Sequence, residues 1–252
     1  MSDSNLENGA KIAGAIPETL KMVDNICEKV GIYDLIKVIY GNKFHYLSEK
    51  QQLRFDNQLN NFKKELENST SNIQEENLQE PKISIVGPAL EASKYYFDEK
   101  EIREMFANLI ASSMDSTYNG IVQHSFVEII KQLSPYDAKL FQSLRDKEAT
   151  VSREKRITSG FDILNECLFI NNLFEDVILN EVSINNLERL GLVKLIKNQY
   201  LTDKNQYRKY NQYGEVISSE GDGKKKYTCK ACILIITALG KAFKKVCLKD
   251  SL

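Results

Sequence analysis

The chain has 252 residues, of which 42% are hydrophobic and 27% are charged, and its formal net charge at pH 7 is −1. This length allows one large domain or two small ones with a proper core, and the composition is that of an ordinary soluble globular protein. The near-neutral charge excludes a long-range attraction of the whole molecule to nucleic acid.

Signals for export and membrane insertion are weak in this chain. The first dozen residues are polar and acidic, unlike a secretory signal peptide, and no apolar run approaches the roughly 20 residues that a membrane-spanning helix needs. The five cysteines are odd in number and scattered, which is typical of free thiols in a reducing cytosol. We therefore expect a cytoplasmic protein without a membrane span.

The first half of the chain predicts helices. We expect a disordered tail over residues 1–10 and a helical region over residues 11–133. In the first predicted helix, Pro17 suits the first turn and Gly31 ends an apolar face of helical spacing. Acidic residues interrupt the cationic polar face that a membrane-surface helix prefers, so packing in a core or a coiled coil is favoured.

A longer helix with an apolar seam follows. Ser48-Glu-Lys-Gln51 has the form of a capping box and would open this helix. The seam residues are spaced four, three and four apart, at Phe55, Leu59, Phe62 and Leu66. Such a seam pairs with another helix, either inside the chain or in a homodimer.

Two further start signals predict the beginnings of later helices. Asp98-Glu-Lys-Glu101 is a second sequence of capping-box type and precedes an apolar stripe. Ser134, followed by Pro135 and Asp137, would cap the next helix. That helix would serve as the first helix of a C-terminal module.

Residues 134–252 predict a winged-helix-like domain. Ser183 is expected to cap a short helix that ends at Gly191, the left-handed residue. Thr237 would cap a closing helix. Two apolar runs between them suit strands, at residues 192–196 and 233–236.

The remaining segments of this half complete the predicted fold. Residues 148–160 are expected to form a loop or a strand, residues 161–178 another helix, and the polar stretch 198–228 an enlarged wing. The fold class is therefore predicted to be mainly α, with a multi-helix N-terminal region followed by a winged-helix-like domain that contains a small β-hairpin.

Few residues indicate catalysis or metal binding. Cys229-Lys-Ala-Cys232 resembles half of a zinc or redox site, but a zinc site needs four ligands, and His45 and His124 lie far away in sequence. Positions three apart on a strand face opposite sides of the sheet, so we favour structural thiols. In the alternative, a metal site, Cys247 would be a third ligand. The chain has no serine nucleophile elbow, phosphate-binding glycine loop or zinc-binding helix. We expect no enzymatic activity, cofactor or metal.

Basic residues and tyrosines gather near the C-terminus. Residues 201–250 hold eleven Lys and Arg against five Asp and Glu, and cations neutralise phosphates while tyrosine rings stack on bases. In a winged-helix domain, the helix predicted between Ser183 and Gly191 would be the one that enters the DNA groove. Its outward positions offer little positive charge, which argues against DNA recognition by this helix. The candidate contact residues for nucleic acid or a partner protein are Asn185, Arg189, Lys204, Arg208, Lys209, Lys224, Lys225 and Lys226.

Residues 81–144 carry the most specific pattern in the chain. From Pro81 it runs through Ile85-Val-Gly-Pro-Ala-Leu-Glu-Ala92, Glu101-Ile-Arg-Glu-Met-Phe-Ala-Asn-Leu-Ile-Ala-Ser-Ser-Met-Asp115 and His124-Ser-Phe-Val-Glu-Ile-Ile-Lys-Gln-Leu-Ser-Pro135. It continues in Asn186-Leu-Glu-Arg-Leu-Gly-Leu192 and Thr237-Ala-Leu-Gly-Lys-Ala-Phe243. Together these stretches resemble the abortive infection alpha (Abi-alpha) family over residues 15–247.

The resemblance implies a bacterial protein of phage resistance, in which an infected cell stops growing or dies before phage are released. It implies no active site, because the shared residues are core, cap and turn positions. We therefore expect a non-enzymatic antiphage protein that binds a partner macromolecule, with a phage or host protein favoured over nucleic acid. The alternative is a winged-helix regulator that binds nucleic acid.

Overall fold

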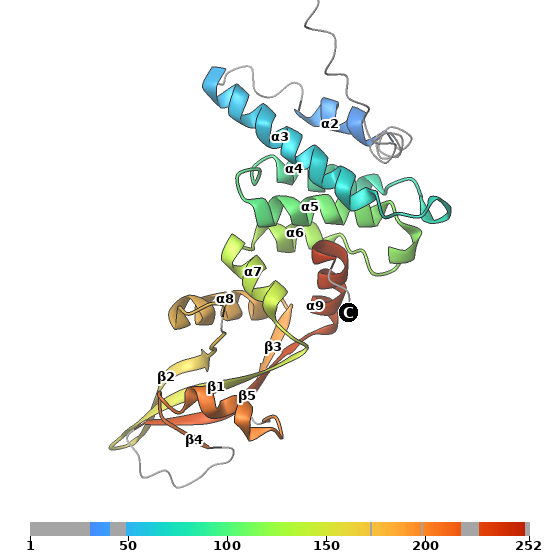
Figure 1. The fold of residues 1–252 in the computed structure, drawn as a ribbon. Helices are drawn as coiled ribbons and strands as arrows, with labels where there is room; N and C mark the ends of the chain where they lie inside the picture. Colours follow the sequence, from blue (N-terminus) through green and yellow to red (C-terminus); the bar gives the residue numbers. More distant parts are fainter. Residues whose placement is uncertain (1–30, 41–48, 172, 198, 218–226, 250–252) are drawn as a thin grey trace, which may run out of the picture.

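The computed structural model describes residues 31–40, 49–171, 173–197, 199–217 and 227–249. Within these ranges, helices occupy the chain as far as Ser143 and the strands follow (Figure 1). None of the helices in these ranges combines the length and the apolar character that crossing a membrane requires. Several predictions concern residues outside the described ranges, namely the 1–10 tail, the Pro17 helix, His45, the Ser48 cap and Lys224, Lys225 and Lys226.

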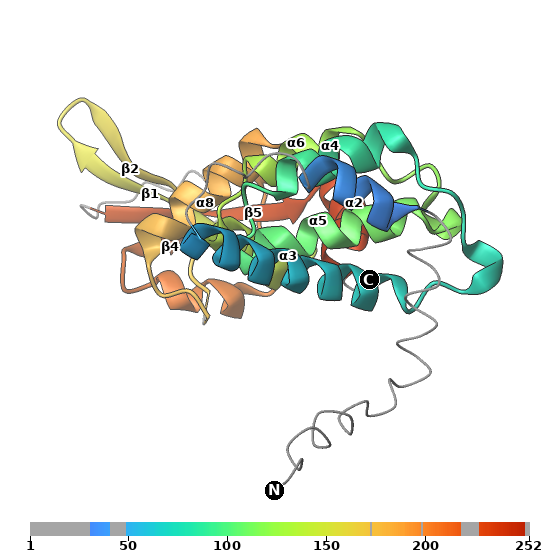
Figure 2. The same cartoon turned by 90° about the horizontal axis from the view of Figure 1, so that it is seen from above.

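A helical body is built around α5 (Lys100–Ser113), of which ten of the fourteen residues are buried. Its other elements are α2 (Ile32–Tyr40), α3 (Glu49–Thr70), α4 (Ile83–Ser93), α6 (Ser125–Lys131) and the 3-10 turns η1 (Glu75–Asn77) and η2 (Ser116–Tyr118). α3, α4 and α6 contact α5 directly, and α2 packs on α4 (Figure 2). The apolar stripe predicted after residue 101 is therefore the centre of the body.

The apolar seam of α3 packs inside the chain. Phe62 and Leu66 are fully buried, and α3 lies against α5. The ring of Phe62 lies 5.4 Å from the ring of Phe97, at the end of the turn before α5. The partner of the seam is thus another helix of the same chain.

The two helix starts predicted at Asp98 and Ser134 have different outcomes. Ser134 forms the expected capping box at the start of α7 (Pro135–Ser143): its Oγ accepts from the Asp137 amide, and the Asp137 carboxylate accepts from the Ser134 amide. The box predicted at Asp98-Glu-Lys-Glu101 is wrong, because the N-cap of α5 is Glu99 and its side chain makes no capping bond.

The second half of the chain forms a curled five-stranded sheet. Four strands follow the order β2-β1-β5-β3, and the fifth, β4, pairs with β5. Its strands are β1 (Lys147–Ile157), β2 (Gly160–Leu168), β3 (Val193–Ile196), β4 (Glu215–Ile217) and β5 (Tyr227–Ile236). β1 pairs antiparallel with β2 and with nearly all of β5. The other edge of β5 is shared, with β3 antiparallel along its C-terminal half and β4 parallel along its N-terminal half.

This sheet contradicts the predicted fold class. The protein is not a mainly α chain that ends in a winged-helix-like domain with a small β-hairpin, because residues 134–252 contribute five strands, including a long β1–β2 hairpin, to one sheet. The expected strands at 192–196 and 233–236 are present as β3 and β5, but they pair within this larger sheet.

The predicted helix over residues 161–178 is wrong, since its first part forms β2. The pairing of β1 with β2 shifts register on either side of Arg153. Such bulges place an extra residue in one strand and break the alternation of apolar side chains by which a strand is identified. The run from Phe161 to Leu168 therefore lacks a clear strand period.

α8 (Val177–Arg189) begins earlier than predicted. Asp176, not Ser183, is its N-cap, and its carboxylate accepts from the amides of Ile178 and Leu179. Ser183 instead lies in the middle of the helix and donates to Asp137 Oδ1 at 2.5 Å. The predicted helix end is confirmed, because Gly191 adopts a left-handed φ of 75° directly after it.

The two faces of the sheet are buried in different hydrophobic clusters. Successive side chains on a strand point to opposite faces. On β1, Ala149 and Val151 pack with the tyrosines of η3 (Lys204–Tyr210). On β5, Leu234 and Ile236 belong instead to the main core, with α8 and the helical body. η3 therefore covers one face of the sheet and α8 covers the other.

The C-terminal segment connects the sheet to the helical body. The predicted cap at Thr237 is confirmed, because its hydroxyl accepts from the Gly240 amide at the start of α9 (Ala238–Phe243). The following π-helical turn η4 (Lys244–Leu248) is held by α5, where Asn108 donates to Cys247 O and Ser112 donates to Val246 O. One core thus includes residues from both halves, and the division at residue 133 stays a prediction.

Replacing Asp137 with alanine is expected to lower the free energy of unfolding by about 3 kcal/mol. The buried carboxylate accepts from Ser183 Oγ, Asn186 Nδ2 and the Ser134 amide, so its loss removes a cap and unpairs donors between α7 and α8. Asp176→Ala removes an exposed cap and should cost only about 1 kcal/mol. Equal losses in chemical unfolding of the two variants would contradict this description.

Candidate functional site

The predicted contact residues lie on two sides of the sheet. Asn185 and Arg189 are exposed on α8, and the Arg189 guanidinium donates to the Gln132 side chain at 2.9 Å, just after α6. Lys204, Arg208 and Lys209 belong to η3, on the opposite face. The described members of the set therefore do not form one surface.

η3 is fixed to the sheet by two tyrosines. Tyr207 and Tyr210 are three residues apart, so they lie on the same side of a 3-10 helix, and both are buried. Tyr207 donates to Cys232 O at 2.9 Å, and Tyr210 donates to Ala149 O at 2.7 Å. Burial raises the pKa of both phenols, so each remains a protonated donor. The outer side of η3 is therefore presented on a rigid base.

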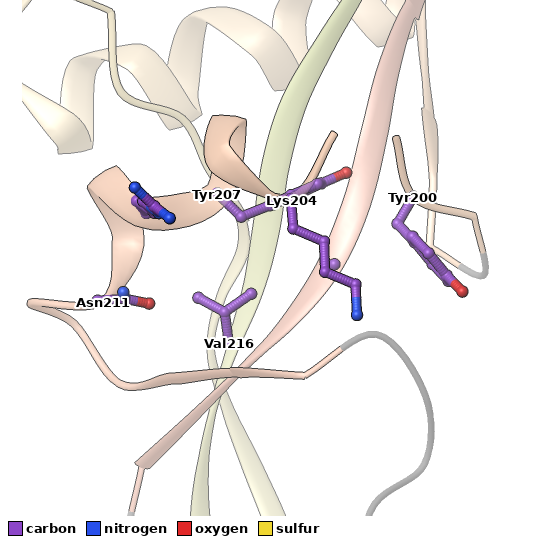
Figure 3. Close-up of a pocket in the computed structure, with 7 residues that line it drawn as sticks. Tyr200, Lys204, Tyr207, Asn211 and Val216 are labelled. Atoms are coloured by element: carbon purple, nitrogen blue, oxygen red, sulfur yellow. The ribbon is translucent and has the colours of Figure 1, made fainter. Parts of the chain in front are cut away.

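A groove of about 240 Å³ runs between η3, β4 and β5. Its lining combines two cations, two phenol rings, an amide and two small apolar side chains. These residues are Tyr200, Lys204, Tyr207, Arg208, Asn211, Val216 and Ala231. Tyr200 and Asn211 lie at opposite ends, and the Lys204 side chain extends between Val216 and Tyr200 (Figure 3). We call this feature the η3 groove.

The cations of η3 differ in availability. Lys204 and Arg208 are exposed, and among the described residues neither side chain takes part in an ion pair or a hydrogen bond. Lys209, in contrast, donates to Ile170 O at 2.6 Å and lies over the rings of Phe169 and Tyr210. Lys204 and Arg208 are thus available to a ligand, whereas Lys209 anchors η3.

A second cation with aromatic neighbours lies on the same face of the sheet. Arg153 pairs with Cys229 across β1 and β5, and Val216 pairs with Cys229 from β4, so both side chains project to the η3 side. The Arg153 guanidinium lies over the rings of Tyr213 and Tyr227 and donates to Tyr213 O at 3.1 Å. Cations and tyrosines therefore extend beyond the groove along this face.

An open depression beside β3 is a weaker candidate. Its lining includes Glu166, Glu188, Lys194 and Lys197, so its charges are mixed. Glu188 accepts from the Leu195 amide at 2.8 Å, and Lys197 pairs with Glu166 at 3.3 Å. Three of these four side chains are thus used to hold the strands and α8 together.

The Cys229 and Cys232 thiols do not converge. Cys229 packs in the cluster beneath η3, while the alternation along β5 places Cys232 on the other face, where its thiol lies near Lys230 O. Burial raises the pKa of Cys229 to about 11, so this thiol is protonated at neutral pH.

His124 is exposed beside Ser84. Among the described residues, no group of three or more His, Cys, Asp or Glu side chains could hold a metal.

The sequence pointed to the two available cations of the groove and to Tyr207 between them, but not to its other walls. Tyr200 and Asn211 fall in the polar stretch that was expected to be a wing. Val216 comes from β4, which pairs in parallel with β5, the strand that holds Ala231. No local period marks such residues, because only the pairing of distant strands brings them together.

Comparison with known proteins identifies a family. Residues 54–247 match the family model described as abortive infection alpha, and this range runs from α3 to η4. No curated protein and no solved structure matches the chain. The family resemblance found in the sequence is thereby confirmed, and the chain belongs to the abortive infection alpha family.

Proposed function

We propose that this protein acts in bacterial phage defence by abortive infection, and that it does so by binding a partner macromolecule rather than by catalysing a reaction. The family match over residues 54–247 supports the role in defence. The observation that supports binding is the η3 groove, where Lys204 and Arg208 are available beside Tyr200.

The chemistry of the groove favours recognition. Cations and phenol rings bind anionic and flat groups. A serine or cysteine activated by a histidine or a carboxylate is a common arrangement for nucleophilic catalysis, and the residues that line the groove include none of these four types. Its tyrosine floor is held by buried hydrogen bonds, so the surface is preorganised for a partner.

Infection of a bacterial strain that carries the gene tests this proposal. The wild-type protein should reduce phage plating, and cultures infected at high multiplicity should stop growing before phage are released. The Lys204→Glu/Arg208→Glu variant should restore plating. Failure of the wild-type protein to protect against any phage of a broad panel would refute the role in defence.

A matched variant separates the groove from net charge. Lys50 and Lys64 are exposed on α3, at the opposite end of the molecule from β4 (Figure 1), so Lys50→Glu/Lys64→Glu changes the total charge equally. This variant should protect like the wild type. If the groove variant also protects fully, partner binding does not occur in the η3 groove.

A further inference from the structure

We propose that the η3 groove binds single-stranded nucleic acid, with phosphates at Lys204 and Arg208 and a base stacked on Tyr200. The inference rests on the proposed function and names the class of macromolecule that the protein would bind. It is carried by the available cations, the half-exposed ring beside them and the concave shape of the site.

The charge of the groove favours an anionic ligand. Lys204 and Arg208 lie four residues apart on η3 and both line the groove, and the lining holds no carboxylate. Asp203, the acidic neighbour in sequence, is used as the N-cap of η3 and accepts from the Asn205 amide at 3.0 Å. Two cations in one hollow favour an anionic ligand such as a phosphate backbone, and the guanidinium can bind a phosphate in bidentate fashion.

The aromatic wall of the groove favours a ligand with a flat group. Tyr200 is 45% exposed and lies at one end of the groove, beyond the Lys204 side chain (Figure 3). A half-exposed phenol ring next to cations offers a flat apolar surface on which a base can stack, whatever the base. Tyr207 cannot play this part, because it is buried and its hydroxyl is bonded to the sheet.

The shape of the groove favours a single strand over a duplex. A protein reads duplex DNA by placing a protruding helix or ribbon in the major groove, whereas these cations and this ring line a hollow of about 240 Å³. A hollow of that kind accepts an unstacked base and its phosphate. Arg153, farther along the same face, donates to Tyr213 O and lies over the rings of Tyr213 and Tyr227, so the proposed contacts are those of the groove alone.

An acidic protein segment would match the cations but would leave the ring without a role. Stacking on Tyr200 therefore discriminates between the two kinds of ligand. A salt dependence alone would not, because both ligands are anionic.

Fluorescence anisotropy with the full chain tests the inference, using labelled oligothymidylate, oligouridylate, a DNA duplex of equal length and a labelled polyglutamate peptide. The wild type should bind the single strands more tightly than the duplex or the peptide, and the two single strands distinguish DNA from RNA. Tyr200→Ala should weaken single-strand binding about tenfold, while Tyr200→Phe retains it. Lys204→Glu/Arg208→Glu should reduce the slope of log affinity against log salt by about 1.4, the value for two phosphates of a single strand.

The matched Lys50→Glu/Lys64→Glu variant should bind like the wild type, and all variants should melt at the wild-type temperature. No binding of either single strand at low salt, or peptide binding as tight as single-strand binding and insensitive to Tyr200→Ala, would overturn the inference. If such a protein still loses phage protection on Lys204→Glu/Arg208→Glu, the proposed function stands and only the class of partner is wrong. Single-strand binding without phage protection would overturn the proposed function instead.

Discussion

Replacing Gly240 with alanine is expected to lower the melting temperature by about 10 °C, which corresponds to a loss of about 3 kcal/mol or more. A Cβ at this position would lie 2.0 Å from Leu192 O and 2.8 Å from Ile236 Cγ2. The Leu192 carbonyl is backbone and already accepts from the Thr237 amide at 3.0 Å, so it cannot move without breaking the junction of α8, β3 and α9. Thermal unfolding followed by circular dichroism measures the effect.

Gly191→Ala provides the matched comparison. Gly191 has a φ of 75°, which is strained for any residue with a Cβ, but its added Cβ would meet only Leu239 Cδ2 at 3.5 Å. The expected cost is that of a left-handed conformation, about 1–2 kcal/mol. Gly191→Asn should cost less, because asparagine tolerates this conformation better. A Gly240→Ala protein that melts no lower than Gly191→Ala would show that α9 does not sit on the Leu192 backbone.

Gly191 and Gly240 belong to two sequence runs that meet in the structure. The run that ends Leu190-Gly-Leu192 and the run that begins Thr237-Ala-Leu-Gly240 are more than forty residues apart. In the structure Thr237 donates through its hydroxyl to Gly191 O at 2.6 Å, and Gly240 lies against Leu192. The two runs thus form the two sides of one junction, through which the sheet connects to the helical body.

Some helix starts and stops were predicted from local residues, whereas the caps predicted at Asp98 and Ser183 were wrong. The Ser134 capping box, the Thr237 cap and the Gly191 stop each depend on a few neighbouring residues, so local chemistry determines them. The seam of α3 was also recognisable, because a 3.5-residue spacing requires a helical partner. Which helix that partner would be is a question of tertiary packing, and the answer is α5.

The extent of the sheet could not be predicted from local patterns, for reasons visible in β1, which was expected as a loop or a strand. Glu148 and Glu154 are buried there, and each is paired with a cation, Arg145 at 2.8 Å and Lys230 at 3.1 Å. Because these buried carboxylates are charged, the sequence of the strand resembles that of an exposed polar segment. Lys230 comes from β5, far along the chain, so its partnership with Glu154 is defined only by the register of the completed sheet.

The candidate site was predicted only in part, because its position also depends on the completed sheet. Lys204 and Arg208 stood out through their charge, and they line the η3 groove. Asn185 and Arg189 were chosen because a winged helix would present them, and α8 instead packs on the face of the sheet opposite to η3. The prediction for Asn185 and Arg189 depended on the winged-helix fold, and it failed with that fold.

Functional experiments on this protein need variants that unfold it as well as variants of the groove. Loss of protection on Gly240→Ala would report reduced abundance of the folded protein, because a loss of a few kcal/mol changes the folded population strongly. Loss of protection on Lys204→Glu/Arg208→Glu at an unchanged melting temperature would report the groove itself. Comparing the two separates the stability of the fold from the recognition of a partner.

Glu65→Ala is the second change with a large expected effect, a loss of about 3–5 kcal/mol. Arg103 is only 8% exposed, and its guanidinium holds the Glu65 carboxylate through Nε at 2.9 Å and Nη2 at 2.7 Å. Its Nη1 donates to Phe97 O. Removing Glu65 would leave a charged guanidinium in the core between α3 and α5, beside the packed rings of Phe62 and Phe97.

The double variant Glu65→Leu/Arg103→Met tests whether the cost comes from the unpaired charge. Apolar side chains of similar volume often replace a buried ion pair without loss, and sometimes with a gain in stability. The double variant should therefore unfold at a denaturant concentration close to that of the wild type, while Glu65→Ala unfolds much earlier. If the double variant is as unstable as Glu65→Ala, the pair contributes through the geometry of its hydrogen bonds to Phe97 and α3, and not through the mutual neutralisation of two buried charges.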